Sequence, residues 1–400
     1  MNGLDGLRTL AVAMVLVYHV RPDILPGGSV GVDVFFTISG FVITRLLLAE
    51  YARTGTVGMS AFYRRRWRRL VPALFALCAV CAVLALTTSL RSFDGHLLAV
   101  LLAATFVMNI VRGAQPGVYS DVTGPLAHTW SLGVEEQFYL VWPPVMILLL
   151  KRLRARTVLI ATAVLCALPV VWRLSLWDPD AAHHIYNGTD TRADQLLAGA
   201  LVAVVLARLP AGDPRLERLR LWAGRLAWPA LAALALTAWQ VPITGDAGWW
   251  TPAWYTVGFL AVAVASAALV AGLELRPHGT LSRLLSLPPL AWTGRNLSYG
   301  MYLWHYPIAR ILGLLGVDTW QLPATAALTI VAALLSYYAI ERPFLRRGQK
   351  KPAAVSAPAA DPAVATSPAS PASPASPASP ASPASPASPA SPASPATPAG

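Results

Sequence analysis

Ten apolar stretches, each long enough to cross a lipid bilayer as a helix, recur along this chain. A spanning helix needs about 20 apolar residues. Hydrophobic residues make up 56% of the sequence and charged residues only 12%, whereas a soluble domain carries about 25% charged residues. The sequence therefore predicts an all-α integral membrane protein and excludes a soluble globular protein or a disulfide scaffold. The predicted spans lie near 6–25, 31–50, 70–90, 133–150, 157–176, 190–208, 225–242, 253–273, 297–316 and 321–340.

Lysine and arginine outnumber aspartate and glutamate by 31 to 19, which gives a net charge of +12. In a soluble protein this excess would favour nucleic acid as a partner. Here the basic residues lie in short loops between the spans, and such loops stay in the cytoplasm. We therefore expect a multi-pass protein of the cell membrane with no nucleic-acid partner and with both termini cytoplasmic. The basic segments are 51–69, 151–156, 208–225, 274–295 and the end of the last span.

A shorter apolar run covers residues 97–111. If this run crossed the membrane, the basic segments 51–69 and 151–156 would lie on opposite sides. If it does not cross, ten spans place every basic loop inside. The sequence therefore predicts a re-entrant or interfacial segment at 97–111.

The end of the chain has a different composition. From about residue 352 it repeats a Ser-Pro-Ala triplet and has no apolar face that could bury a core. We expect a membrane domain at 1–347 and a disordered, extended cytoplasmic tail at 348–400. The tail is interpreted as a dispensable spacer, with the docking of a partner as the alternative.

Ionisable side chains within apolar spans are costly and mark functional sites by default. Arg8 and His19 both lie in the first span, on nearly the same face and about 16 Å apart along a helix. This spacing suits a long substrate that is held at the cytoplasmic mouth and reacts deeper in the membrane. Histidine suits proton transfer near neutral pH. The alternative is a histidine that only packs against a neighbouring helix.

Residues 128–139, H-T-W-S-L-G-V-E-E-Q-F-Y, are rich in polar groups where the fourth span begins. In a continuous helix His128, Glu135 and Tyr139 would share one face. A carboxylate beside an imidazole can orient it. The alternative is an interfacial aromatic belt that includes Trp130.

Further polar residues in the spans are candidates for a substrate pocket. Asp33 caps a helix or pairs with a basic group, and Arg192 needs a partner if it is buried. For Glu341 the alternative is an ion pair at the end of the helix, with Arg342 or another inner arginine. The remaining candidates are Asp190 at the start of the sixth span and Ser298, Tyr302 and His305 on one face of the ninth.

Several common chemistries have no support in the sequence. We find no Walker A loop, no G-x-G-x-x-G fingerprint, no H-E-x-x-H and no G-x-S-x-G elbow. Cys78 and Cys81 form a C-x-x-C, but it lies in an apolar stretch without a second pair or a histidine cluster. We therefore expect no metal site.

Seven segments in order along the chain resemble the membrane-bound acyltransferase 3 family, of the O-antigen and peptidoglycan O-acetylase type. The resemblance covers nearly all of 1–345, and Arg8 and His19 reproduce the family's Arg-x10-His. The segments are L-D-G-L-R-T-L-A-V at 4–12, G-V-D-V-F-F-T-I-S-G-F at 31–41, F-Y-R-R-R-W-R-R-L-V-P at 62–72, H-T-W-S-L-G-V-E-E-Q-F-Y at 128–139, D-T-R-A-D at 190–194, S-Y-G-M-Y-L-W-H-Y-P at 298–307 and Y-Y-A-I-E-R-P at 337–343.

The resemblance implies an O-acyltransferase that moves an acyl group, usually acetyl, from acyl-CoA to a hydroxyl. The acyl-CoA is a co-substrate, and no tightly bound cofactor is expected. His19 would be the general base or the group that handles the acyl moiety, Arg8 would hold the CoA end, and Glu135 would orient groups in the pocket. The arginines that would face the CoA phosphates are Arg64, Arg65, Arg66, Arg68 and Arg69.

The acceptors that the family implies are surface glycans, glycolipids or macrolides. Many relatives carry an additional C-terminal hydrolase-like domain, which this chain replaces with the Ser-Pro-Ala tail. Either the membrane domain completes the transfer alone or a separate extracytoplasmic transferase does so. The alternative function is a transporter or flippase of a glycolipid or polar metabolite, because polar residues within spans fit transport equally well.

Overall fold

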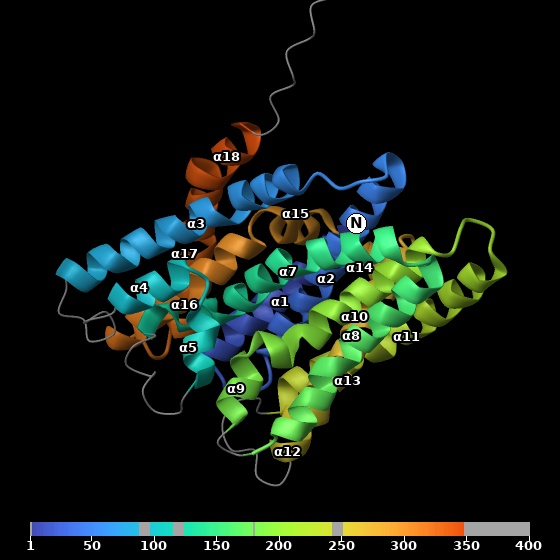
Figure 1. Cartoon of the computed structure of the whole chain (residues 1–400). Helices are drawn as coiled ribbons and strands as arrows, with labels where there is room; N and C mark the ends of the chain where they lie inside the picture. The colour runs from blue at the N-terminus through green and yellow to red at the C-terminus, as the bar shows by residue number, and fades with distance from the viewer. Residues whose placement is uncertain (1, 88–96, 115–123, 179–180, 242–250, 348–400) are drawn as a thin grey trace, which may run out of the picture. The chain divides into compact units, whose positions relative to one another are not determined.

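The computed structural model describes residues 2–87, 97–114, 124–178, 181–241 and 251–347, and all regular structure in these residues is helical. The predicted tail at 348–400 lies outside the described residues. The helices are α1 (Asn2–Val20), α2 (Val30–Thr54), α3 (Met59–Thr87), α4 (Leu97–Ala104), α5 (Met108–Ala114), α7 (Trp130–Arg152), α8 (Ala155–Leu176), α9 (Ala182–Asn187), α10 (Thr189–Ala207), α11 (Pro214–Gln240), α12 (Thr251–Ala253), α13 (Phe259–Leu275), α14 (Thr280–Leu285), α15 (Pro288–Asn296), α16 (Ser298–Leu314), α17 (Gln321–Ser336) and α18 (Arg342–Arg347), with 3-10 or π turns η1 (Gly124–Thr129), η4 (Trp254–Gly258) and η5 (Tyr337–Glu341) (Figure 1).

Seven stretches of the described residues are long and apolar enough to cross a membrane, and the bent pair α4–α5 makes an eighth if it is one span. Helices also occupy the other three predicted spans, but these helices are too short or too polar to count among the seven. α16 has only 17 residues, α10 carries three charged residues in its first six, and α7 carries two adjacent glutamates. The prediction of an all-α membrane protein is therefore confirmed. Helix length and hydropathy support seven of the ten predicted spans, and the eighth candidate, α4–α5, is the segment predicted to be re-entrant or interfacial.

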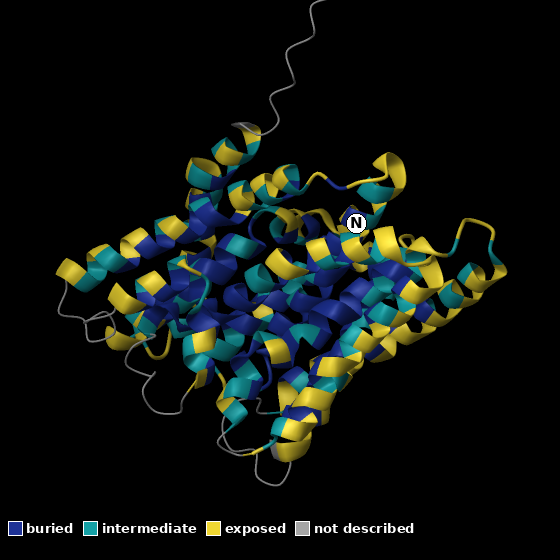
Figure 2. Ribbon diagram, viewed as in Figure 1, coloured by how far each residue is buried: buried dark blue, intermediate teal, exposed yellow. Residues whose placement is uncertain are grey.

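The innermost helices are those that carry polar residues. Of the apolar windows of α1 and α2, 56% and 61% are buried inside the protein, against 28% for α8 and for α11. Figure 2 shows the same gradient, with buried residues at the centre of the helical domain and exposed ones on the outer faces of the peripheral helices. Buried polar groups of the central helices are thus shielded from lipid by a shell of apolar helices.

Two glycines let α2 and α10 approach backbone to backbone. A Cβ on Gly40 would overlap the carbonyl oxygen of Leu196, and a Cβ on Gly199 would overlap that of Thr37. Small residues at such positions are a common means of packing helices in a membrane, where the hydrophobic effect does not drive helix association. This crossing fixes α10 against α2 beside the polar centre.

The predicted re-entrant segment corresponds to a sharp bend. The axes of α4 and α5 differ by 118°, and Phe106 at the break has a φ of 59°. Gln137 of α7 donates a hydrogen bond of 3.0 Å to the Phe106 carbonyl, and a second of 2.9 Å to Asn109 Oδ1. A backbone group freed by a helix break must find such a partner at membrane depth. Both a re-entrant loop and a broken span have this geometry.

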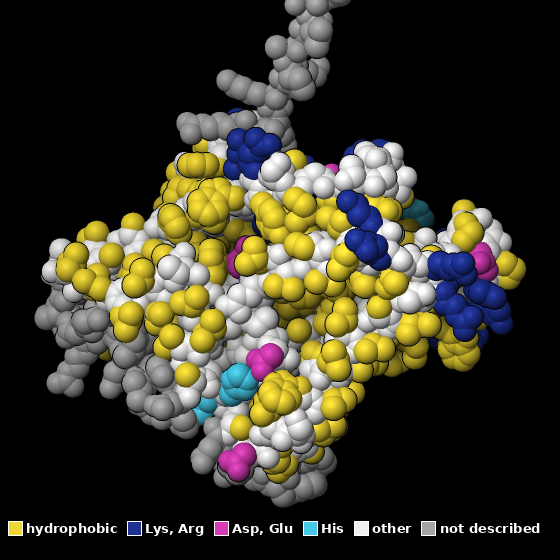
Figure 3. All heavy atoms as spheres, viewed as in Figure 1, with side chains coloured by type: hydrophobic (Ala, Val, Ile, Leu, Met, Phe, Trp, Pro, Cys, Tyr) yellow, Lys and Arg dark blue, Asp and Glu magenta, His cyan; other side chains and the backbone are white. Residues whose placement is uncertain are grey.

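Basic side chains gather at the ends of the helices. Lys and Arg lie along the upper and right-hand edges of the face in Figure 3, and apolar side chains cover much of the surface between them. An apolar band bordered by basic side chains is the surface expected of a protein that spans a bilayer.

Candidate active site

Three histidines from distant parts of the chain meet in the interior. His305 of α16 lies 3.0 Å from His19 of α1, measured from Nε2 to Nδ1. The ring of His128 in η1 lies 5.4 Å from that of His305. His128 and His305 are 2% and 0% exposed. Each histidine was a separate candidate in the sequence, and the fold brings all three together.

Aromatic and basic groups surround this cluster. The Tyr306 ring lies 4.8 Å from the His19 ring and 5.1 Å from the His128 ring, between centroids. Arg112 of α5 donates a hydrogen bond to Asn187 and lies near enough to act electrostatically on His19 and His128. The bent pair α4–α5 therefore contributes a positive charge to the surroundings of the histidines.

A cavity of about 110 Å³ lies beside the cluster. Tyr302 lines it, and the Tyr302 ring is 5.6 Å from the His128 ring and 5.5 Å from the His305 ring. The Tyr302 hydroxyl donates to the His128 carbonyl at 2.8 Å and contacts the Ser131 hydroxyl at 2.5 Å. Tyr302 and Ser131 thus separate the cavity from the histidines.

Arginines line the other side of the cavity. Arg8, Arg66 and Arg69 all border it. Arg8 pairs with Asp5 at 3.0 Å. The Arg66 guanidinium stacks on Tyr139, with its carbon 3.1 Å from the ring centroid. Charged guanidinium groups at a cavity wall can bind carboxylates, phosphates or a polarised carbonyl.

The five predicted CoA arginines separate into two groups. Arg66 and Arg69 border the cavity, although Arg69 is also exposed. Arg64, Arg65 and Arg68 do not border it; the first two are exposed and Arg68 is half-buried. Arg65 also lies 3.5 Å from Glu50. A helix cannot direct six consecutive positions into one cavity, so only residues three apart share the inner face.

Glu135 lies with the arginines and not with the histidines. Its carboxylate accepts a hydrogen bond of 2.7 Å from Ser39 of α2 and borders the cavity. The predicted shared helix face of His128 and Glu135 is wrong. His128 lies in the 3-10 turn η1, before α7 begins, so the two residues are not on one continuous helix.

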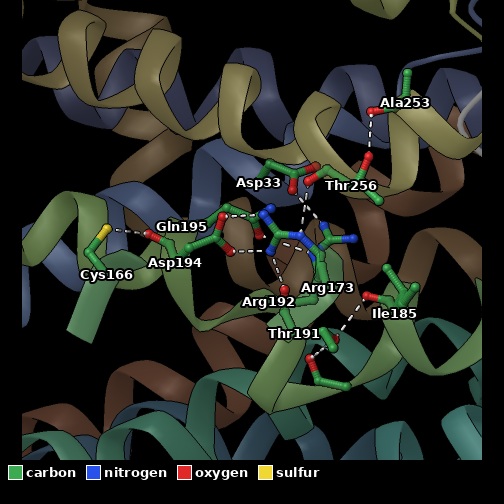
Figure 4. Close-up of polar contacts among 11 residues, drawn as sticks. Asp33, Cys166, Arg173, Ile185, Thr191, Arg192, Asp194, Gln195, Ala253 and Thr256 are labelled. Carbon is green, nitrogen blue, oxygen red and sulfur yellow. Dashed lines mark hydrogen bonds and ion pairs between the residues drawn. The ribbon is translucent and has the colours of Figure 1, made fainter. Parts of the chain in front are cut away.

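A second buried cluster consists of two ion pairs (Figure 4). Arg192 contacts Asp33 at 2.5 Å, and Arg173 forms two hydrogen bonds to Asp194 at 2.8 and 2.7 Å. These four side chains do not border the cavity described above. Arg173 is not among the residues that the sequence analysis identified. Its position inside an apolar span is the signal that could have revealed it.

The remaining predicted pocket residues do not form one group. Ser298 borders the cavity and donates to the Gly294 carbonyl at 2.6 Å. Trp130 packs on Tyr186, with ring centroids 4.9 Å apart. Asp190 bonds to His184 and Trp172 at the surface. Glu341 is buried and accepts a hydrogen bond from Ser336. Among the described residues, no group of three or more His, Cys, Asp or Glu side chains is arranged to hold a metal ion.

The fold and the site define a multi-pass membrane protein with a histidine cluster and an arginine-lined cavity in its interior. The acyltransferase 3 family model, described as an acyltransferase domain, matches residues 1–341. The chain therefore belongs to the acyltransferase 3 family, whose members transfer acyl groups. No solved structure matches the chain.

Curated relatives in three bacteria agree with this family. The chain is 32% identical to the peptidoglycan O-acetyltransferase OatA of Listeria monocytogenes, over 86% of this chain and 56% of the relative. It is 33% identical to the O-acetyltransferase OatA of Staphylococcus aureus, over 87% and 58%. It is also 33% identical to the putative peptidoglycan O-acetyltransferase YrhL of Bacillus subtilis, over 86% and 55%. The chain thus spans a little over half the length of these relatives.

Proposed function

We propose that this chain is an integral-membrane O-acetyltransferase that moves an acetyl group from acetyl-CoA to a hydroxyl of a cell-wall carbohydrate, with His19 as the general base. The observation that carries the proposal is the hydrogen-bonded pair His19–His305, whose neighbour Tyr302 also borders the arginine-lined cavity. The acceptor class follows two of the relatives, whose names specify peptidoglycan. Glycolipids and macrolides are the alternative acceptors.

The reaction requires one base in the right protonation state. His19 takes the proton from the acceptor hydroxyl while the hydroxyl oxygen bonds to the acetyl carbonyl carbon. The carbon–sulfur bond then breaks, and the sulfur leaves with the proton that His19 received. The products are the acetyl ester and free CoA, and the histidine returns to its neutral form.

The arginines indicate how the donor would lie. Arg8, Arg66 and Arg69 line the cavity, and guanidinium groups bind phosphates and polarised carbonyls. They would hold the inner part of the donor, and the CoA phosphates would lie outside, near Arg64, Arg65 and Arg68.

The proposed topology has ten spans, with the basic loops and both termini in the cytoplasm. Helices at all ten predicted positions and the basic edges of the domain support it. The proposed substrate-pocket residues remain Asp33, His128, Trp130, Asp190, Arg192, Ser298, Tyr302, His305 and Glu341. An additional extracytoplasmic transferase would complete delivery to a polymer if the membrane domain does not.

The test is acceptor-dependent release of CoA from acetyl-CoA by purified protein in lipid nanodiscs. His19→Ala should lower the rate by at least about 100-fold, the usual contribution of a general base. His278→Ala, which removes an exposed histidine outside the site, should retain the wild-type rate. An active His19→Ala protein would overturn the base assignment. Wild-type protein that neither binds CoA nor releases it would favour the transport alternative.

A further inference from the structure

The hydrogen bonds around His305 determine where its ring proton lies. His305 Nδ1 faces two backbone carbonyl oxygens, those of Tyr302 at 2.7 Å and Met301 at 3.2 Å. A carbonyl oxygen only accepts, so Nδ1 carries the proton. The ring is fully buried, and no carboxylate of the described residues forms an ion pair with it. An imidazolium there would be an uncompensated buried charge, so the ring is neutral and its Nε2 is an acceptor.

The same reasoning then determines the tautomer of His19. Its Nδ1 lies 3.0 Å from His305 Nε2 and 3.0 Å from the Val15 carbonyl oxygen. Both neighbours are acceptors, so His19 Nδ1 carries a proton. In a neutral ring this leaves the lone pair on Nε2. The described residues offer His19 Nε2 no hydrogen-bond partner.

We infer that His305 is a positioning residue, which accepts the Nδ1–H of His19 and thereby presents His19 Nε2 as the base. The catalytic part of this inference rests on the proposed function, in which Nε2 is the nitrogen that receives the hydroxyl proton. When it does so, His19 becomes an imidazolium whose Nδ1–H already points at a neutral acceptor. His305 thus takes the place that an orienting carboxylate has in a catalytic triad.

The other neighbours of the pair do not take this role. His128 Nε2 donates to the Leu303 carbonyl at 3.1 Å, and its Nδ1 has no partner among the described residues. No hydrogen bond is formed between His128 and His19. Tyr306 contacts both rings edge-on or tilted, and Arg112 contributes a positive charge from α5. The Val15 carbonyl lies 3.0 Å from the same Nδ1–H and shares it as a second acceptor from within α1.

Nitrogen NMR of the protein with ¹⁵N-labelled histidine rings, in lipid bilayers, tests the tautomer without reference to activity. The His19 signals are identified from their loss in His19→Gln. We expect one protonated Nδ1, one unprotonated Nε2 and a through-hydrogen-bond coupling to His305 Nε2. Protonation of His19 at Nε2 in the neutral ring, or the absence of coupling to His305, would overturn the inference.

Kinetics of two variants test the role in catalysis. His305→Phe keeps a planar ring but removes the acceptor, so kcat should fall by roughly 100-fold with KM for acetyl-CoA unchanged. His305→Gln supplies a carbonyl oxygen near the position of Nε2 and should recover most of that loss. Equal activity of the two variants, high or low, would contradict the positioning role. If wild-type protein releases no CoA while the NMR result holds, the proposed function fails and the tautomer assignment stands.

Discussion

Arg66 borders the cavity, and its side chain is 19% exposed, against 63% for Arg65 of the same segment. Its guanidinium stacks on Tyr139, and its Nε lies 3.4 Å from Glu136 Oε1 in an ion pair. A hydrogen bond to a charged group contributes about 1.5–3 kcal/mol. We expect Arg66→Ala to raise KM for acetyl-CoA by roughly 10- to 100-fold.

The measurement is the dependence of CoA release on acetyl-CoA concentration. Arg53→Ala is the matched control. It removes the same charge, but from an exposed position at the end of α2. If both variants raised KM equally, the effect would come from net charge and not from the cavity.

Which residues meet at the site was only partly predictable. His19 and His305 were identified by the rule that polar groups inside apolar spans are costly, and His128 by the polar segment where the fourth span begins. Their mutual contacts depend on the rotation and order of helices, and one sequence does not specify these. Glu135 illustrates the limit, because the start of α7 at Trp130 decides that it bonds to Ser39 and not to an imidazole.

At the level of elements, hydropathy predicted a helix at each of the ten positions where the structure has one, but not the packing between helices. The glycines of α2 and α10 occur within apolar helices, and nothing local in the sequence indicates that they bring the two backbones together. The special character of the α4–α5 segment was inferred only from the expectation that the basic loops on either side lie on the same side of the membrane. Gln137, which completes that bend, lies 31 residues away from the Phe106 carbonyl.

The glycine contact between α2 and α10 gives a prediction about stability. Gly199→Ala should destabilise the protein by about 1–3 kcal/mol, because a Cβ there overlaps the backbone of Thr37. The midpoint of thermal unfolding in detergent should fall by several degrees. Gly3→Ala is the control, since its Cβ would meet ordinary contacts, the nearest at 3.6 Å. Equal midpoints for the two variants would contradict the close crossing.

At the level of the whole molecule, the family match ends at residue 341, before the Ser-Pro-Ala repeat begins. The repeat cannot bury a core of its own. We expect deletion of 352–400 to leave CoA release within about twofold of the full chain, because every residue of the proposed site precedes it. Comparison of the two proteins in the same nanodiscs checks this. A large loss of rate would mean that the tail recruits a partner that the reaction needs.

The ion pair between Arg173 and Asp194 has a consequence for how the chain enters the membrane. A charge without a partner costs about 2.5–3.5 kcal/mol at the centre of an inserting helix and less toward its end, and Arg173 lies in the last turn of α8. Arg173 in α8 finds its partner only in α10, which follows the short helix α9. During synthesis α8 therefore emerges with a charge that nothing yet neutralises. The segment from α8 to α10 should leave the translocon as one unit, so that biogenesis of this domain depends on a pair of residues that do not border its cavity.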